Sequence, residues 1–128
     1  MAASILVVED NADNMQLMHY LLKAFGYEPL LARSGAEGIR LARERRPDLV
    51  LMDVQMPEMD GYQATEAIKS ELDACPVIAV TAFAMVGDER RIMARGFDGY
   101  ISKPITPDTF VAEIEAFLPE ELRDRSSG

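Results

Sequence analysis

Of five short apolar runs in this sequence, four lead into polar side chains that could carry out chemistry. Two acids follow the first run, one acid follows the third, a hydroxyl follows the fourth, and an amine stands just beyond the fifth: Glu9, Asp10, Asp53, Thr81 and Lys103. If the runs are strands of an open parallel α/β sheet, these groups meet at one edge, because ligands in such sheets lie beyond the carboxyl ends of the strands. The sequence therefore predicts one pocket built from strand ends.

The predicted pocket holds three carboxylates, which cannot comfortably remain ionised together. A divalent cation resolves that conflict, and a set of oxygen ligands suits Mg²⁺. Lys103 is a compact, mobile cation that can pair with a carboxylate or a phosphoryl group, and Thr81 supplies a hydroxyl donor. A carboxylate such as Asp53 can accept a phosphoryl group as an acyl phosphate, in a reaction that mainly needs positioning and neutralised charge. We therefore expect Mg²⁺-dependent phosphoryl transfer to Asp53.

The elements that must position these groups alternate along the chain. Strands are expected at the unbroken apolar runs 5–8, 29–32, 49–52, 77–80 and 100–101. Helices are expected, from apolar spacing and from start and stop signals, at 15–25, 34–46, 64–72, 88–95 and 107–118. Ser34, with Glu37 three residues later, predicts a capping box, and Pro107 is expected at the first position of the last helix. This alternation indicates a parallel sheet covered on both faces, a doubly wound (βα)5 three-layer α/β fold.

Composition limits the class of protein. With 128 residues and an apolar fraction of 48%, the chain suits one domain with a single core. We expect that domain at residues 1–118, followed by a charged, flexible tail at 119–128. The apolar runs are too short for a membrane span. The single cysteine, Cys75, excludes an internal disulfide and favours a reducing cytoplasm, and the net charge of −9 disfavours direct binding to nucleic acid.

The motifs together resemble the receiver domain of two-component response regulators. They occur in the matching order and spacing between about Ser4 and Leu118: Glu9-Asp10, Asp53 in DVQMPEMDG, Val80-Thr81-Ala82 and Lys103-Pro104. The stretches FAMVGDERR and YISKPI are similar to those of stand-alone cell-cycle receivers and of receivers in hybrid histidine kinases. The resemblance implies a flavodoxin-like fold with strand order 2-1-3-4-5. It also implies a signalling switch that takes a phosphoryl group from a histidine kinase or a histidine phosphotransfer protein and catalyses only its own phosphorylation and dephosphorylation.

The resemblance further implies roles for the acids. Asp53 is implied as the phosphoacceptor. Asp10 and Asp53 are implied as Mg²⁺ ligands, together with the backbone carbonyl of Gln55, and Glu9 would hold a metal-bound water. The first acid of the pair is more often Asp in this family, so Glu9 is a departure that changes the reach of the side chain.

Other implied roles concern the signal. Thr81 and Lys103 would bind the phosphoryl oxygens, and Tyr100 would be an aromatic switch whose ring follows the Thr81 loop. A downstream protein partner would then bind the face formed by the fourth helix, the fifth strand and the fifth helix. A cis peptide is expected between Lys103 and Pro104, although cis bonds are a minority even before proline.

Two other functions stay open at this point. A Mg²⁺-dependent phosphatase or phosphotransferase would also use an aspartate nucleophile, but that class generally needs a second acid two residues later, and Gln55 stands there. A structural pseudo-receiver that is never phosphorylated is disfavoured because no motif residue is missing. An alternative interpretation of Tyr100 is that it only packs in the core, since an aromatic side chain at a strand end is commonly part of the core.

Overall fold

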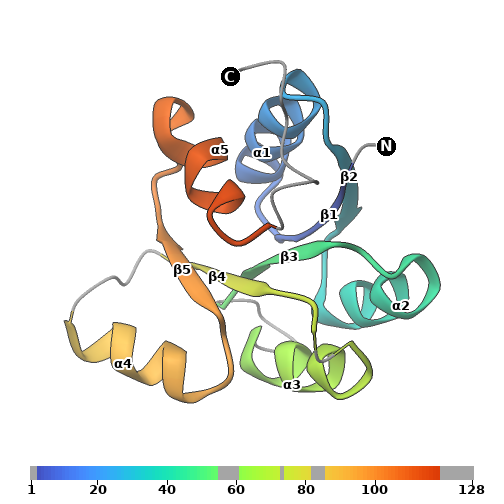
Figure 1. Cartoon of the computed structure of the whole chain (residues 1–128), viewed down its shortest axis with the longest axis vertical. Helices are drawn as coiled ribbons and strands as arrows, with labels where there is room; N and C mark the ends of the chain where they lie inside the picture. Colours follow the sequence, from blue (N-terminus) through green and yellow to red (C-terminus); the bar gives the residue numbers. More distant parts are fainter. Residues whose placement is uncertain (1–2, 55–60, 73, 82–85, 119–128) are drawn as a thin grey trace.

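The structure, a computed structural model, describes residues 3–54, 61–72, 74–81 and 86–118. Strands and helices alternate along the chain (Figure 1): β1 (Ser4–Val8), α1 (Ala12–Ala24), β2 (Glu28–Ala32), α2 (Gly35–Arg45), β3 (Leu49–Asp53), α3 (Gly61–Glu71), β4 (Val77–Thr81), α4 (Val86–Ala94), β5 (Gly99–Ser102) and α5 (Pro107–Glu115). The expected alternation is confirmed. The expected tail, residues 119–128, lies outside the described residues.

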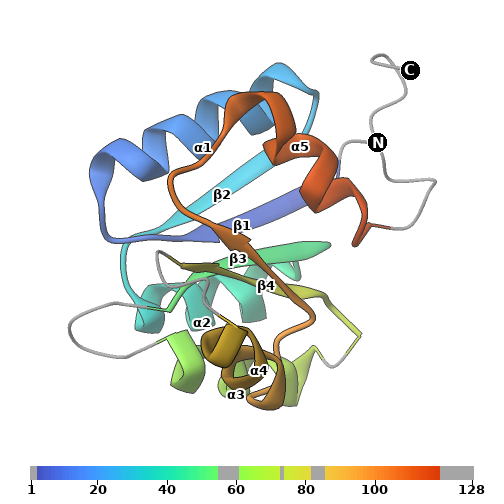
Figure 2. The same ribbon diagram turned by 90° about the vertical axis from the view of Figure 1, so that its left-hand side faces the viewer.

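The five strands form one parallel sheet in the order β2-β1-β3-β4-β5, which confirms the doubly wound fold. Helices α1 and α5 cover one face, and α2, α3 and α4 cover the other (Figures 1 and 2). Side chains of β1 alternate between two core clusters: Ile5 and Val7 pack with residues of α1 and α5, and Leu6 and Val8 with residues of α2, α3 and α4. Because the inner strands are buried on both faces, they appear in the sequence as unbroken apolar runs.

Two helix starts depend on local polar side chains. Asn11 caps α1, since its side-chain oxygen accepts a hydrogen bond from the backbone N–H of Asn14 at 2.9 Å. At α2 the expected capping box is present in a modified form. Ser34 Oγ accepts from the Glu37 N–H at 3.2 Å, and the Glu37 carboxylate accepts from the Arg33 N–H at 2.9 Å. In the usual box that second bond would go to the N–H of the capping residue itself.

The boundaries of several helices differ from those expected. Helix α1 begins at Ala12 rather than at 15, α3 begins at Gly61 rather than at 64, and α5 ends at Glu115 rather than at 118. Apolar spacing marks only the buried turns of a helix, whereas its first turn is positioned by capping and by solvent-facing residues. Helix α5 begins at Pro107, as expected. In the part of the chain that the structure describes, no helix is both long and apolar enough to cross a lipid bilayer.

Candidate functional site

Three carboxylates meet at the carboxyl ends of β1 and β3. Glu9 and Asp10 follow β1 directly, and Asp53 is the last residue of β3. One ligand oxygen from each of the three lies within 4.8 Å of the other two. Glu9 and Asp53 are buried, whereas Asp10 is exposed. The convergence expected from a parallel sheet is present, and it follows from the register that sets Val8 beside Met52.

Lys103 brings a positive charge to these acids. Its Nζ lies 3.2 Å from Glu9 Oε1 and 3.6 Å from Asp53 Oδ2. Its backbone N–H donates to the carbonyl of Thr81 at 2.8 Å, which ties the end of β5 to the end of β4. The Lys103–Pro104 peptide is cis, as expected. The β5–α5 connection thus delivers the ammonium group to acids that come from β1 and β3.

Thr81 and Tyr100 lie on the same side of the sheet. Thr81 is buried at the end of β4, and Tyr100 is half-buried in β5. The register pairs Ala79 with Tyr100 and Thr81 with Ser102. Ala79 and Thr81 are two residues apart on one strand, so the side chains of Thr81 and Tyr100 point to the same face. Tyr100 packs against the core cluster that contains Ile92 of α4.

The acid cluster has the composition of a cation site. Glu9 is fully buried, and its Oε1 accepts no hydrogen bond from the residues that the structure describes. The approach of Lys103 Nζ to this oxygen is an ion pair without hydrogen-bond geometry. One ammonium group facing three carboxylates leaves an excess of negative charge, which favours binding of a further cation. The residues present therefore fit a hard divalent ion that takes oxygen ligands.

One contact at the site was not found by reasoning from the sequence. The backbone N–H of Asn11 donates to Glu9 Oε2 at 3.2 Å, while the Asn11 side chain caps α1. The start of α1 therefore also holds the buried carboxylate. An asparagine just ahead of a helical segment is an N-cap signal, and that signal could have identified Asn11. Gln55, expected to offer its backbone carbonyl, lies outside the described residues.

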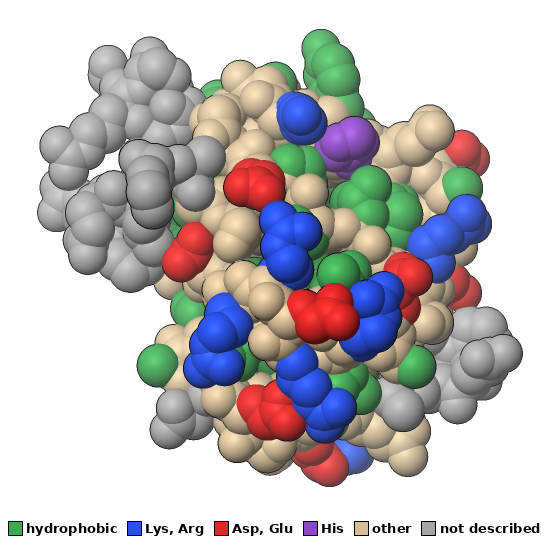
Figure 3. Space-filling view, turned by 90° about the vertical axis from the view of Figure 1, so that its right-hand side faces the viewer, with side chains coloured by type: hydrophobic (Ala, Val, Ile, Leu, Met, Phe, Trp, Pro, Cys, Tyr) green, Lys and Arg blue, Asp and Glu red, His purple; other side chains and the backbone are tan. Residues whose placement is uncertain are grey.

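Charged side chains on the face that carries α2 are mixed in sign (Figure 3). Three arginines of α2 form ion pairs with N–O distances of 3.0, 2.8 and 3.2 Å: Arg40 with Glu44, Arg43 with Glu71, and Arg45 with Glu28. Such exposed pairs contribute little to stability. They do show that each of these arginines is paired with an acid. The face therefore differs from the unpaired basic stripe that is typical of nucleic-acid-binding proteins.

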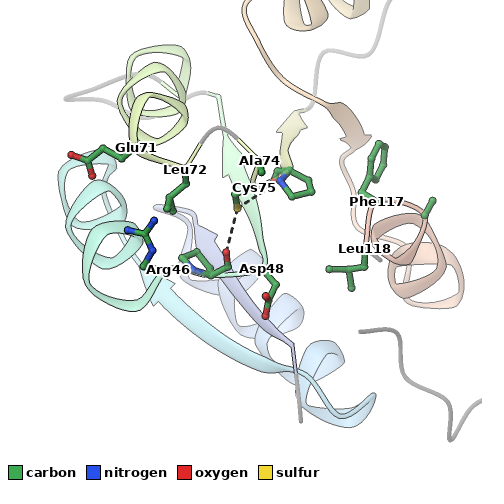
Figure 4. Close-up of a pocket in the computed structure, with 11 residues that line it drawn as sticks. Arg46, Asp48, Glu71, Leu72, Ala74, Cys75, Phe117 and Leu118 are labelled. Atoms are coloured by element: carbon green, nitrogen blue, oxygen red, sulfur yellow. Dashed lines mark hydrogen bonds between the residues drawn. The ribbon is translucent and has the colours of Figure 1, made fainter. Parts of the chain in front are cut away.

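A hollow of about 620 Å³ lies at the end of the sheet where β3 and β4 begin, away from the acids at the carboxyl ends of the strands (Figure 4). Cys75 lines it, and the thiol donates a hydrogen bond to the carbonyl of Pro47, with an Sγ–O distance of 3.4 Å. Burial raises the pKa of the Cys75 thiol to about 11, an effect that the charge of Lys69 partly offsets. A thiol with this pKa is protonated near neutral pH and is a poor nucleophile. Cys75 is therefore a packed thiol at the sheet edge opposite to the acids.

The sequence of this chain is similar to those of known signalling proteins. Residues 5–115 match the family model of the response regulator receiver domain. The polar-differentiation response regulator DivK of Brucella anthropi is 51% identical to this chain over 120 residues, which span 92% of this chain and 98% of that protein. DivK of Brucella ovis is 51% identical over the same length and with the same coverage.

Solved structures agree with the sequence match. The chemotaxis protein CheY4 of Vibrio cholerae superposes with a TM-score of 0.87 at 28% identity, covering 92% of this chain and all of that chain. The receiver domain of the sensor histidine kinase PA1611 from Pseudomonas aeruginosa, solved with a magnesium ion in its active site cleft, superposes with a TM-score of 0.83 at 32% identity, covering 91% of this chain and 98% of that chain. With acids, threonine and lysine gathered at the strand ends, the chain therefore belongs to the response regulator receiver domains and is a phosphorylation-dependent switch of two-component signalling.

Proposed function

We propose that Asp53 accepts the phosphoryl group of this switch, and that the donor is a histidine kinase or a histidine phosphotransfer protein. The observation that carries the proposal is a buried carboxylate at the end of β3, beside two further acids and 3.6 Å from the ammonium group of Lys103. An oxygen of Asp53 forms the new bond to phosphorus while the phosphorus–nitrogen bond of the donor breaks, and the electron pair leaves with the donor imidazole. The product is an acyl phosphate.

Mg²⁺ is the cofactor that suits this cluster. Asp10, Asp53 and the backbone carbonyl of Gln55 would be its ligands, and Glu9 would hold it through a water. When bound, the ion supplies positive charge that offsets the charge of the phosphoryl oxygens. The choice of ion is supported by the oxygen-only donor set. It is also supported by the magnesium ion in the cleft of the PA1611 receiver domain.

The Thr81 hydroxyl and the Lys103 ammonium group are the proposed partners of the phosphoryl oxygens. Thr81 would move toward the phosphoryl group and open space for the ring of Tyr100. The shared face of these two side chains, set by the β4–β5 register, supports this coupling. The change is a shift between existing states, so its size is limited by how differently the two states bind phosphate.

The output surface that we propose is the face formed by α4, β5 and α5. A hollow of about 740 Å³ lies beside β5 on this face, and its lining includes Tyr100, Thr109, Glu113 and Phe117. A downstream protein partner that binds there would sense the position of the Tyr100 ring. The net charge of −9 and the paired arginines of α2 support a protein rather than a nucleic acid as that partner.

The setting that we propose is the cytoplasm, where a lone thiol such as Cys75 stays reduced. Residues 1–118 would form the switch itself, and the charged segment 119–128 would be a flexible tail. Neither the switch nor the tail would need a membrane to act.

The test is labelling with a small phosphodonor, such as acetyl phosphate, in the presence of Mg²⁺. The wild-type chain should take up about one phosphoryl group per chain, and hydroxylamine should remove it because acyl phosphates are labile. Asp53→Asn should abolish the label, while Asp13→Asn, a matched change of an exposed acid in the first turn of α1, should retain it. Full labelling of Asp53→Asn would refute the proposal. Sustained turnover of varied phosphoesters would instead indicate a phosphatase, and inertness a pseudo-receiver.

A further inference from the structure

Lys103 lies closer to Glu9 than to Asp53, the proposed phosphoacceptor. Its Nζ is 3.2 Å from Glu9 Oε1 and 3.5 Å from Glu9 Oε2, but 3.6 Å from Asp53 Oδ2. The side chain of Glu9 is fully buried, and that of Lys103 is 17% exposed. The ammonium group therefore makes its two shorter contacts with the acid that is not expected to react.

Glu9 needs a positive partner because a buried carboxylate is stable as an anion only when its charge is compensated. Among the described residues its partners are the Asn11 N–H on Oε2 and the Lys103 ammonium group. A divalent cation bound among the three acids would compensate the same charge. It would also repel an ammonium group a few ångströms away. Lys103 and the cation are therefore alternative partners for Glu9.

We propose that Glu9 is a positioning residue for Lys103. Without a bound divalent cation Glu9 holds the ammonium group, and binding of the cation releases it from Glu9 so that it can pair with the incoming phosphoryl group. This inference rests on the proposed function of Asp53 and of the cation site. It goes beyond the proposed function in one respect: the position of the Lys103 ammonium group depends on whether the cation is bound, and Glu9 transmits that dependence.

The length of the Glu9 side chain makes this contact possible. The Glu9 backbone is anchored because its N–H donates to the carbonyl of Ala32 at 3.0 Å, and the Lys103 backbone is anchored to the carbonyl of Thr81 at 2.8 Å. Glu9→Asp would draw the carboxylate back by about one carbon–carbon bond, roughly 1.5 Å. The contact would then stretch beyond the roughly 4 Å limit of an ion pair unless Lys103 moved to follow it.

The chain is well suited to a direct test because it has three lysines, Lys23, Lys69 and Lys103. In protein labelled with ¹³C and ¹⁵N at lysine, NMR would follow the side-chain resonances during titration with MgCl₂. The Lys103 resonance should shift at the same midpoint concentration of Mg²⁺ as the backbone amide resonances of Asp10 and Asp53. Lys69 is the internal control, because its ammonium group is held by Asp98 at 2.7 Å, a contact independent of the acid cluster.

Two variants test the pairing of Glu9 with Lys103 independently of the other acids. In Glu9→Gln, which keeps the side-chain length but removes the charge, the Lys103 resonance should start near its Mg²⁺-bound wild-type position and move less on titration. Lys103→Met should raise the affinity for Mg²⁺ by between about 5-fold and 150-fold, the usual range of a coupling between two ligands. The gain should be smaller in the Glu9→Gln background. If Glu9→Gln does not fold, Glu9→Asp should displace the Lys103 resonance in the same direction.

The outcomes distinguish this inference from the proposed function. If the amides of Asp10 and Asp53 respond to Mg²⁺ while Lys103 behaves like Lys69, the role of Glu9 is overturned and the proposed site stands. An equal movement of Lys103 in wild type and in Glu9→Gln would also overturn it. If no amide near the acids responds to Mg²⁺, the cation site itself fails, and the proposed function fails with it.

Discussion

Replacement of Gly99 by alanine should push the ring of Phe117 off strand β5. A Cβ at position 99 would lie 2.3 Å from Cζ, 2.8 Å from Cε1 and 3.1 Å from Cε2 of Phe117. These distances are too short for carbon atoms, which make favourable contact at about 3.5–4.0 Å. Gly99 is buried and does not have a positive φ, so the backbone would accept alanine and the clash decides the result.

The clash is with the far end of a half-buried side chain that can turn into the hollow beside β5, so the expected cost is at the low end of the range for overpacking, about 1 kcal/mol of unfolding free energy. For a chain of this length the entropy of unfolding is roughly 0.27 kcal/mol per kelvin, so a loss of about 1 kcal/mol lowers Tm by about 4 °C. Urea unfolding followed by circular dichroism gives the free energy, and a thermal scan gives Tm. Because Phe117 lines the hollow beside Tyr100, NMR shifts in Gly99→Ala should also concentrate on β5 and α5.

A double-mutant cycle isolates the clash. In the Phe117→Ala background the ring is absent, so Gly99→Ala should be nearly neutral, which corresponds to a coupling of about 1 kcal/mol between the two positions. The reasoning is refuted if Gly99→Ala changes the wild-type stability by less than about 0.5 kcal/mol. It is also refuted if the loss is the same with and without the Phe117 ring.

Other expected outcomes test separate parts of the molecule. Arg46 follows α2 with φ 45° and ψ 67°, so Arg46→Gly should raise the unfolding free energy by about 1 kcal/mol. Arg45→Gly, inside the last turn of α2, should lower the unfolding free energy by a similar amount. If both variants were less stable than the wild type, the left-handed backbone at Arg46 would not be a source of strain. Because burial raises the pKa of Cys75 from 9.0 to about 11, iodoacetamide at pH 8 should alkylate the native thiol about 100-fold more slowly than the unfolded one. The native rate should rise with pH up to about 11, and equal native and unfolded rates at pH 8 would count against burial. Asp10→Asn should weaken Mg²⁺ binding by about tenfold or more, and an unchanged affinity in calorimetry would remove Asp10 from the ligand set. The Thr81→Ala variant should still take up the phosphoryl label. In this variant, however, the backbone NMR shifts that beryllofluoride causes in α4 and β5 should be smaller than in the wild type. The full wild-type pattern of shifts would argue against the coupling.

Much of the fold could be predicted from the sequence because the signals that define its elements are local. A strand buried on both faces is an unbroken apolar run, and Ser34 with Glu37 marks a helix start within four residues. The meeting of Asp10 and Asp53 at one sheet edge was also predictable, since parallel strands end on the same side. Local signals were weakest at helix ends, where α1 begins three residues before its apolar pattern.

The order of the elements, the family and the group of side chains that share the pocket could all be inferred from the sequence. How these side chains pair their charges could be seen only in the folded chain. It buried Glu9 and left Asp10 exposed, although the two are neighbours in the chain. It also set Lys103 nearer to Glu9, 94 positions away, than to Asp53. Burial and ion pairing could not be inferred because they depend on which strand ends lie side by side and on how far each side chain reaches across the gap between them.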